Sequence, residues 1–459
     1  MSRLLNELSQ KTANEHLKER FRRLLTADAV DPGRVAPGGA APDRAAPGRV
    51  APDRVASDRV ASEDMVQLQF VPGRIEVFGK HTDYAGGESL TCASQHGIAA
   101  FVQRHDAPSL VIDDYARSTT IELTYDDPVA APSWSLYPAA VLKRMIRHFG
   151  VPRRGVRLGI HSDLPGASGM SSSSSLIISV ILALLQDEGY ESARSILNSP
   201  VELAGFAGAL ESGADYGPFS GDQGVGTKGG SQDHTAILMS SAGELGLYSY
   251  EPIDKLSAIK LPEDVIFVVG TSGVKARKTG QAKERYNAAS LAAREVARMY
   301  SEDVGESYSN LGSMMASPNF DRDGLRHCIQ DELLWNRFSQ YERECALVIP
   351  RAMEALARRD WATFGAMSDE SQRMAAELLG NQVPETVDLA RIAREAGALG
   401  ASSFGAGFGG AVWALIARDD SKRFLSHWRT SYLESYPQHA GKSRFFRDSP
   451  GEGAWTVKS

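Results

Sequence analysis

The stretch LPGASGMSSSSSLIISVILALL, residues 164–185, joins a loop of glycines and serines to a run of apolar residues. The apolar run predicts a helix over residues 171–186 that is too short to cross a bilayer. A glycine-containing loop at a helix N-terminus exposes backbone N–H groups and the positive helix end, which together bind phosphate. Ser171 or a neighbour could simply cap the helix, but five consecutive serines exceed what a cap needs. We therefore expect a phosphate-binding loop.

A second stretch, PGRIEVFGKHTDYAGG at residues 72–87, leads from a predicted strand into a polar turn. The run Lys-His-Thr-Asp at 80–83 offers hydrogen-bond donors and acceptors in four consecutive positions, which suits a polyhydroxylated ligand. Arg74 precedes the turn and could supply a fixed positive charge. The alternative is a hairpin turn with polar residues on the surface, in which His81 is a structural histidine.

Two further segments are rich in small residues, GGSQDH at 229–234 and GAGFGG at 405–410. Asp233 could reach a bound substrate from such a segment, although it could equally cap a helix. The glycines at 405–410 let the backbone approach a ligand or another loop, or form a tight turn between strands. No Walker A sequence occurs, which disfavours a P-loop kinase. The GxGxxG matches at 224–229 and 405–410 lack the strand and the chain length that NAD binding needs.

Strands dominate the first part of the chain and helices the second, which predicts an α+β protein of two domains. Expected strands lie at 66–71, 75–78, 98–103, 110–113, 119–125, 155–161 and 265–269, near 402, and at 412–417. Expected helices lie at 137–149, 171–186, 201–211, 276–300, 336–358, 361–379, 385–396 and 421–436.

The N-terminus differs in character from this body. Residues 3–25 place Leu and Phe at helical spacing beside basic residues, so we expect a helix that docks on its own domain; a helix at a membrane surface is the alternative. From Asp31 to Ser62 a short unit of Pro, Ala, Arg and Asp repeats without aromatic residues, which is typical of a disordered linker. The predicted division is an arm at 1–27, a linker at 28–63, and domains at 64–245 and 246–459.

The composition narrows the class of protein. The net charge of -7 and pI of about 5.9 disfavour a general binder of nucleic acid or anionic membrane, because phosphate backbones attract an excess of Lys and Arg. Cys92, Cys328 and Cys345 lie far apart without a CxxC pair, which disfavours zinc and disulfide frameworks. No secretory signal or membrane-spanning run is evident. We therefore expect a cytoplasmic monomer that binds small molecules, and no nucleic acid or membrane.

Taken together, these segments resemble the GHMP superfamily of small-molecule kinases, and most closely galactokinase. Residues 72–84 are similar to the galactokinase signature, 165–174 to the nucleotide loop, and 405–410 to the C-terminal glycine motif, in the family's order. The resemblance covers about 65–457 and includes Tyr286-Asn287 on a predicted helix and the GEGA tail at 451–454. It implies an N-terminal domain with a ribosomal-protein-S5-like layer, a ferredoxin-like C-terminal domain, and ATP and substrate between the two.

The resemblance also implies roles for single residues. Asp233 matches the catalytic aspartate, and Arg74 matches the arginine near it. Sugar contacts are matched by Lys80, His81, Thr82, Asp83 and Tyr286. The ATP loop is matched by Gly166, Ala167, Ser168, Gly169, Met170, Ser171, Ser172 and Ser173. Ser173 is the expected Mg²⁺ ligand and Glu211 its acidic partner, although the segment from Glu211 to Asp233 is longer than in galactokinases. The implied reaction transfers the γ-phosphoryl group of ATP to the anomeric hydroxyl of galactose or a related sugar.

One position departs from the galactokinase pattern. Lys80 stands where galactokinases carry a Glu that contacts the sugar, and a cation there could instead pair with a carboxylate, which raises a uronic acid as substrate. Glu76 stands where the family usually has a neutral Asn and could pair with Lys80. Three alternatives follow: a kinase for a uronic acid or another sugar, a sugar and ATP sensor without catalysis, and a kinase for a non-sugar alcohol such as mevalonate or homoserine.

Overall fold

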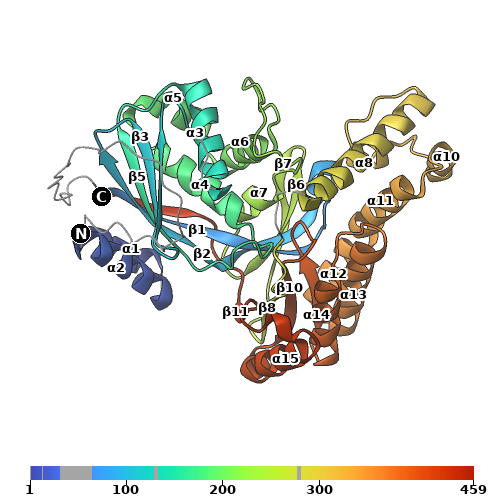
Figure 1. Ribbon diagram of the computed structural model, residues 1–459. Helices are drawn as coiled ribbons and strands as arrows, with labels where there is room; N and C mark the ends of the chain where they lie inside the picture. Colours follow the sequence, from blue (N-terminus) through green and yellow to red (C-terminus); the bar gives the residue numbers. More distant parts are fainter. Residues whose placement is uncertain (1, 13, 31–64, 129–132, 277–280, 459) are drawn as a thin grey trace, which may run out of the picture.

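The computed structural model describes residues 2–12, 14–30, 65–128, 133–276 and 281–458, and it consists of two lobes built on separate sheets (Figure 1). This arrangement confirms the predicted α+β class with two domains. The first sheet has eight strands in the order β12-β1-β2-β5-β3-β4, with β6 paired to β2 and β7 paired to β6. Its strands are β1 (Met65–Phe78), β2 (Ser89–His105), β3 (Ser109–Asp114), β4 (Thr119–Thr124), β5 (Gly155–Ser162), β6 (Glu244–Tyr250), β7 (Ile253–Lys260) and β12 (Trp455–Lys458).

Three of these strands, β6, β7 and β12, were not predicted from the sequence. The predicted domain boundary at 245/246 falls inside β6, so the first sheet continues to residue 260 and also takes in the C-terminal residues 455–458. The strands expected at 66–71 and 75–78 form one strand, with a register shift between Pro72 and Arg74. A β-bulge of this kind re-aims the side chains that follow it, and Arg74 is the first of them.

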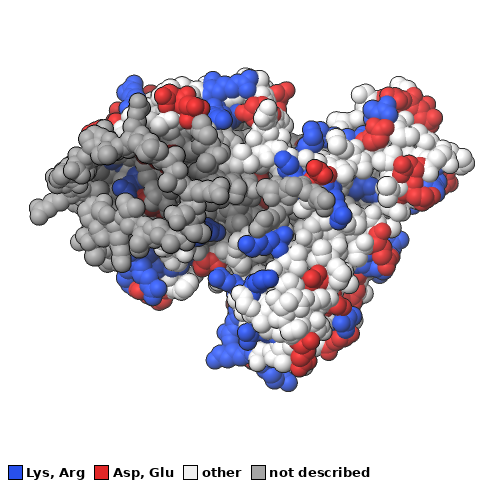
Figure 2. Space-filling view, in the orientation of Figure 1, with Lys and Arg blue, Asp and Glu red and all other residues white. Residues whose placement is uncertain are grey.

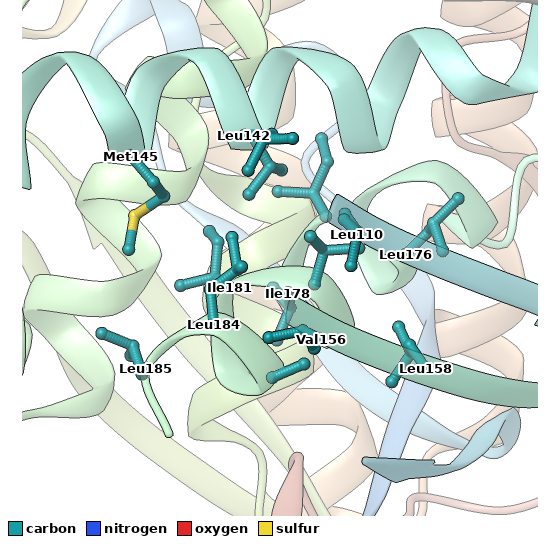
Figure 3. Close-up of a cluster of buried hydrophobic side chains, with 14 of the residues drawn as sticks. Leu110, Leu142, Met145, Val156, Leu158, Leu176, Ile178, Ile181, Leu184 and Leu185 are labelled. Atoms are coloured by element: carbon teal, nitrogen blue, oxygen red, sulfur yellow. The ribbon is translucent and has the colours of Figure 1, made fainter. Parts of the chain in front are cut away.

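Both faces of the first sheet are buried, which explains the continuous apolar run in β2. Ile98, Ala100 and Val102 pack against helices, while Ala99 and Phe101 face the opposite side. The helices on the first face are α3 (Leu136–Phe149), α4 (Ser172–Leu184), α5 (Glu191–Ile196), α6 (Pro200–Ser212) and α7 (Gln232–Met239). Figure 3 shows side chains of α3, α4, β3 and β5 meeting in this core.

The N-terminal arm covers the other face. It consists of two helices, α1 (Ser2–Lys11) and α2 (Glu15–Val30), so the single helix predicted over 3–25 is wrong in that detail. The second helix begins after Asn14, whose side-chain oxygen accepts a hydrogen bond from the Leu17 amide at 3.1 Å. The arm docks on its own domain, as predicted: Phe21 and its apolar neighbours pack against Phe70 and Trp455. Helix α2 reaches into the predicted linker, whose residues 31–63 lie outside the described residues.

The second sheet is antiparallel, in the order β11-β8-β10-β9. Its strands are β8 (Val265–Thr271), β9 (Gly400–Phe404), β10 (Ala411–Ala417) and β11 (Phe445–Asp448). Alternate residues of β8 serve two cores. Phe267 packs with α12, α13 and the end of β1, while Val268 packs with α14 and α15. The shared core with β1 joins the two lobes.

The remaining helices belong to the C-terminal half. They are α8 (Gln281–Val304), α9 (Leu311–Met315), α10 (Arg322–Cys328), α11 (Glu332–Arg343), α12 (Ile349–Arg358), α13 (Trp361–Glu377), α14 (Pro384–Glu395) and α15 (Ser421–Ser435). The helix predicted over 336–358 is interrupted by a π-helical turn at Glu344–Val348. Helices α8, α10 and α11 project from the body in Figure 1, and Figure 2 shows both signs of charge mixed over them. No described helix is both long and apolar enough to span a bilayer.

The arm is tied to the sheet by one buried cation as well as by apolar packing. Arg20 is 3% exposed, donates to the carbonyl oxygen of Gly97 at 2.7 Å and pairs with Asp163 at 3.0 Å. The arm is therefore part of the folded domain and contributes to its stability.

We predict that Phe21→Ala destabilises the protein by about 3 kcal/mol, because a fully buried ring is replaced by a cavity. The matched control is Arg23→Ala on the same helix, where the side chain is 72% exposed and the expected change is within about 0.5 kcal/mol. Denaturant unfolding of the full chain measures both variants. Equal effects would mean that the arm does not pack as described.

Candidate active site

A pocket lies between the lobes, at the end of β1 and the start of α7. Residues from the predicted motifs line it together: Arg74, Asp83, Asp233, Tyr286 and Ala406. They come from segments far apart in the sequence, so the fold brings the predicted site together. The pocket is narrow and lined by charged and glycine residues.

The innermost feature of this pocket is an ion pair between Arg74 and Asp233. The Nη2 atom of Arg74 lies 2.7 Å from Oδ1 of Asp233, and its Nε donates to the same oxygen at 2.9 Å. Arg74 is 3% exposed, and burial alone would lower its pKa, but Asp233 and Glu76 raise the pKa above its usual value. Asp233 occupies the first turn of α7, where the helix dipole also favours a carboxylate. Both groups are therefore held ionised.

The serine-rich loop lies directly beside this pair. The Nη1 atom of Arg74 donates to the carbonyl oxygen of Gly169 at 2.6 Å. Ser171 has φ of 60°, and α4 begins at Ser172, so the loop enters the helix through a left-handed turn. In this first turn of α4, the Ser174 hydroxyl donates to Glu211 at 2.8 Å and lies 3.4 Å from Asp233. The phosphate-binding loop expected over 166–173 thus adjoins the predicted catalytic pair.

The turn at 80–83 contributes two side chains to the pocket. His81 has a φ of 58°, its Nδ1 lies 2.8 Å from the Tyr84 hydroxyl, and its Nε2 lies 3.2 Å from the Ala406 carbonyl oxygen. Asp83 accepts a hydrogen bond from the amide of Gln232 at 3.3 Å. A non-glycine residue in the left-handed region is uncommon, and such residues concentrate at functional sites. The ring of Tyr286 on α8 packs at a tilt against His81, with ring centroids 5.0 Å apart.

The other two residues of this turn face away from the pocket. Thr82 is fully buried, and its hydroxyl donates to the carbonyl oxygens of Gly79 and Glu88. Lys80 is 1% exposed, and its Nζ donates to Ser371 at 2.7 Å and Ser402 at 2.8 Å. Lys80 and Thr82 therefore do not line the pocket in this structure, and their placement among the sugar contacts stays a prediction. The reason is that Gly79 (φ of 96°) and His81 reverse the chain direction on either side of Lys80.

The carboxylate partner of Lys80 is internal. Ser371 donates to Glu344 at 2.9 Å, and Glu344 also accepts the Gly79 amide at 2.8 Å. Burial lowers the pKa of Lys80, while Glu344 and Glu76 oppose this shift. Glu344 lies in the π-helical turn, so this irregular part of the helix places a carboxylate next to the turn at 80–83. The predicted pairing of Lys80 with a substrate carboxylate is replaced by this buried network.

Glu76 is the charged residue of β1 that faces the pocket next to Arg74. Its Oε2 lies 3.8 Å from Nη2 of Arg74, and the side chain is 1% exposed. Burial raises the pKa of Glu76 to about 7, although Arg74 and Lys80 act in the opposite direction. The pocket therefore holds a second carboxylate close to Asp233.

Two glycine contacts explain why small residues recur in these motifs. A Cβ atom on Gly405 would lie 2.7 Å from the carbonyl oxygen of Gly169, which joins the C-terminal glycine motif to the serine-rich loop. A Cβ atom on Gly230 would lie 2.6 Å from Asp83. Side chains at either position would separate the segments that form the pocket.

The carboxylate and hydroxyl oxygens around Glu211 are ligands that suit a magnesium ion. Glu211 is buried beside Ser174, and Ser173 lies half-buried in the same first turn of α4. Among the described residues no three His, Cys, Asp or Glu side chains are grouped as a metal site. Mg²⁺ commonly takes one or two protein oxygens and completes its shell with substrate phosphates and water. Such partial ligation is what Glu211 and the adjacent serines offer.

Sequence reasoning missed two polar residues of the site. His234 lies 3.1 Å from Glu211 through Nε2, and Ser174 links Glu211 to the Asp233 carboxylate. His234 directly follows Asp233 in the sequence, so its place next to the predicted catalytic residue could have indicated a role in the site. Ser174 could have been found among the five serines, since it directly follows the loop and lies in the first turn of α4.

Comparison with known proteins agrees with the geometry. The family model for the galactokinase galactose-binding signature matches residues 61–104, the GHMP kinases N terminal domain matches 137–223, and the GHMP kinases C terminal model matches 352–433. The galactokinase of Lacticaseibacillus casei is 28% identical over 386 residues, which cover 80% of this chain and 89% of that protein. The galactokinase of Exiguobacterium sibiricum is 28% identical over 405 residues, which cover 85% of this chain and 93% of that protein.

Solved structures show the same fold. Lactococcus lactis galactokinase complexed with galactose superposes with a TM-score of 0.72 at 22% identity, covering 85% of this chain and 95% of that one. L. major mevalonate kinase in complex with R-mevalonate gives a TM-score of 0.52 at 17% identity, covering 84% of this chain and 96% of that one. The chain thus resembles the GHMP kinase superfamily in both lobes, and the curated relatives that match it along most of its length are galactokinases.

Proposed function

We propose that this protein is an ATP-dependent sugar kinase that phosphorylates the anomeric hydroxyl of galactose or a related sugar. The observation that carries the proposal is the buried Arg74–Asp233 pair, 2.7 Å apart, on the floor of a pocket that adjoins the serine-rich loop. An ionised carboxylate beside a phosphate-binding loop places a proton acceptor next to the terminal phosphate. That is the arrangement a phosphoryl transfer to a hydroxyl needs.

Each group then has a distinct task. The loop at 166–173 and the N-terminus of α4 bind the nucleotide phosphates through backbone N–H groups. Asp233 accepts the proton of the attacking hydroxyl. Arg74 fixes the orientation of Asp233 and offsets negative charge on the phosphoryl group. Mg²⁺, held by Glu211 and Ser173 together with the phosphates, would neutralise phosphate charge.

The pocket favours a sugar over the other alcohols considered. His81, Asp83 and Tyr286 together present a ring, a carboxylate and a hydroxyl toward one space, which suits a ring with several hydroxyl groups. The intact Arg74–Asp233 pair disfavours a sensor without catalysis. A uronic acid is disfavoured because Lys80 faces Glu344 and the pocket itself holds carboxylates.

The first prediction concerns the proton acceptor. Asp233→Asn should lower turnover by roughly 10²-fold or more, because the amide cannot accept the hydroxyl proton, while ATP still binds. A coupled ADP assay with galactose measures turnover, and calorimetry measures ATP affinity. Asp264→Asn, at a surface position 59% exposed, is the control and should keep wild-type activity. Turnover retained in Asp233→Asn would reject the role of Asp233 as base.

The second prediction concerns Lys80. Lys80→Met should destabilise the protein by about 3 kcal/mol, because Glu344 is left buried without its cation. Lys80→Met combined with Glu344→Gln should recover part of that loss, as measured by denaturant unfolding. The ratio of activity on galactose to activity on galacturonate should not move in the folded variants. A gain of galactose over galacturonate would instead restore the substrate-carboxylate role of Lys80.

The third prediction concerns pH. The folded-state pKa of Glu76 is about 7, above the ordinary 4.5, so the folded protein binds this proton more tightly than the unfolded chain. The stability contributed by the neutral form is present below pH 4.5 and is lost as pH rises through 7. Relative to Glu76→Gln, the wild type should lose up to about 3 kcal/mol of unfolding free energy between pH 5 and pH 8. If the unfolding free energies of the two proteins changed with pH in the same way, that result would contradict the raised pKa of Glu76.

A further inference from the structure

Glu76 is a buried carboxylate whose charge is not balanced within the pocket. It lines the pocket, and its Oε1 has no hydrogen-bond partner among the described residues. Its other oxygen lies 3.8 Å from Arg74, beyond hydrogen-bond distance. A buried carboxylate oxygen without a hydrogen-bond partner is costly, and the nearby charges of Arg74 and Lys80 only partly offset the burial of Glu76, so its presence points to a partner that arrives with the ligand.

The charges around the pocket show why the unbalanced negative charge is that of Glu76. The carboxylates that line the pocket are Glu76, Asp83, Glu211 and Asp233, and Arg74 is the single Arg or Lys among the described lining residues. Arg74 makes its short contacts with Asp233. Glu211 contacts Ser174 and His234, and Asp83 accepts the Gln232 amide. Each of these three has a close partner that Glu76 lacks.

We propose that Glu76 selects a sugar that carries a protonated amino group next to the reacting hydroxyl, that is, a 2-amino-2-deoxyhexose. The proposal rests on the proposed sugar kinase function and names the substrate class of that same site. An ammonium group donates hydrogen bonds to a carboxylate and also neutralises its charge. A neutral hydroxyl can only donate a hydrogen bond. A uronic acid would add another negative charge.

The position of the amino group follows from the shared guanidinium. Glu76 and Asp233 both approach Nη2 of Arg74, at 3.8 Å and 2.7 Å. The hydroxyl that reacts lies at Asp233, so a substituent on the adjacent ring carbon is the one that falls beside Glu76. Burial raises the pKa of Glu76 to about 7, and a bound ammonium lowers it again, so the bound state is the ion pair.

The experiment compares four sugars on the full-length protein at pH 7.5: galactose, 2-deoxygalactose, galactosamine and N-acetylgalactosamine. Galactose carries a neutral hydroxyl of similar size in place of the ammonium, so it tests the charge, while the acetylated sugar keeps the nitrogen, loses the charge and adds bulk. ADP release gives kcat/KM for each sugar, with Glu76→Gln as the test variant. Glu244→Gln on β6, outside the pocket-lining residues, is the control and should behave as wild type.

We expect wild-type protein to prefer galactosamine over galactose and over N-acetylgalactosamine by roughly 10-fold or more. Glu76→Gln should lower the ratio of galactosamine to galactose by a similar factor, mainly through KM. A ratio that is the same in both proteins would overturn the proposal, even if both phosphorylate galactose well.

A second measurement separates this proposal from the kinase proposal. If no sugar yields ADP, the kinase function fails, and calorimetric binding of galactosamine to wild type and Glu76→Gln still decides the role of Glu76. Binding that weakens about 10-fold in the variant supports selection of the ammonium. Equal binding in the two proteins overturns it.

Discussion

The buried ion pair of Arg74 with Asp233 is the interaction on which the rest of the site depends. A guanidinium that is 3% exposed needs more than one acceptor, and it finds them in Asp233 on α7 and in the Gly169 carbonyl of the serine-rich loop. One side chain therefore sets the distance between the strand, the helix and the loop. Removing either charge would leave the other buried and unpaired, and removing Arg74 would also break its hydrogen bond to the loop.

Two cations of the same motif have opposite roles, which the sequence could not reveal. Arg74 faces the pocket, whereas Lys80 points into the core between the lobes. The difference arises from the left-handed backbone at Gly79 and His81 and from partners contributed by distant helices. Ser371 and Glu344 lie more than 260 positions further along the chain, so no local pattern links them to Lys80. The uronic acid hypothesis followed from Lys80 standing where galactokinases carry a Glu, and the internal hydrogen bonds of Lys80 to Ser371 and Ser402 weigh against it.

What the sequence predicted well was local. The loop at 166–173, the Asp233 motif and the glycine motif at 405–410 each carry their own turn chemistry, and the order of these motifs indicated the superfamily. The strands β6 and β12 pair with β2 and β1, which are distant in the sequence, so no local pattern indicated them, and β7, which pairs with β6, was missed together with its partner. The helix expected over 336–358 was predicted without its π-helical turn, since helical periodicity does not register one extra residue per turn.

Charge is distributed unequally across the site, and Arg74 lies between the nucleotide side and the sugar side. On the nucleotide side, the loop and the start of α4 offer N–H groups and hydroxyls, which suit phosphate. On the sugar side, Glu76, Asp83 and Asp233 make the space negative. An anionic ligand placed on the sugar side would meet repulsion that Arg74, already engaged by Asp233 and Gly169, cannot offset. The same guanidinium thus separates an anion-binding half from a half that accepts neutral or cationic groups.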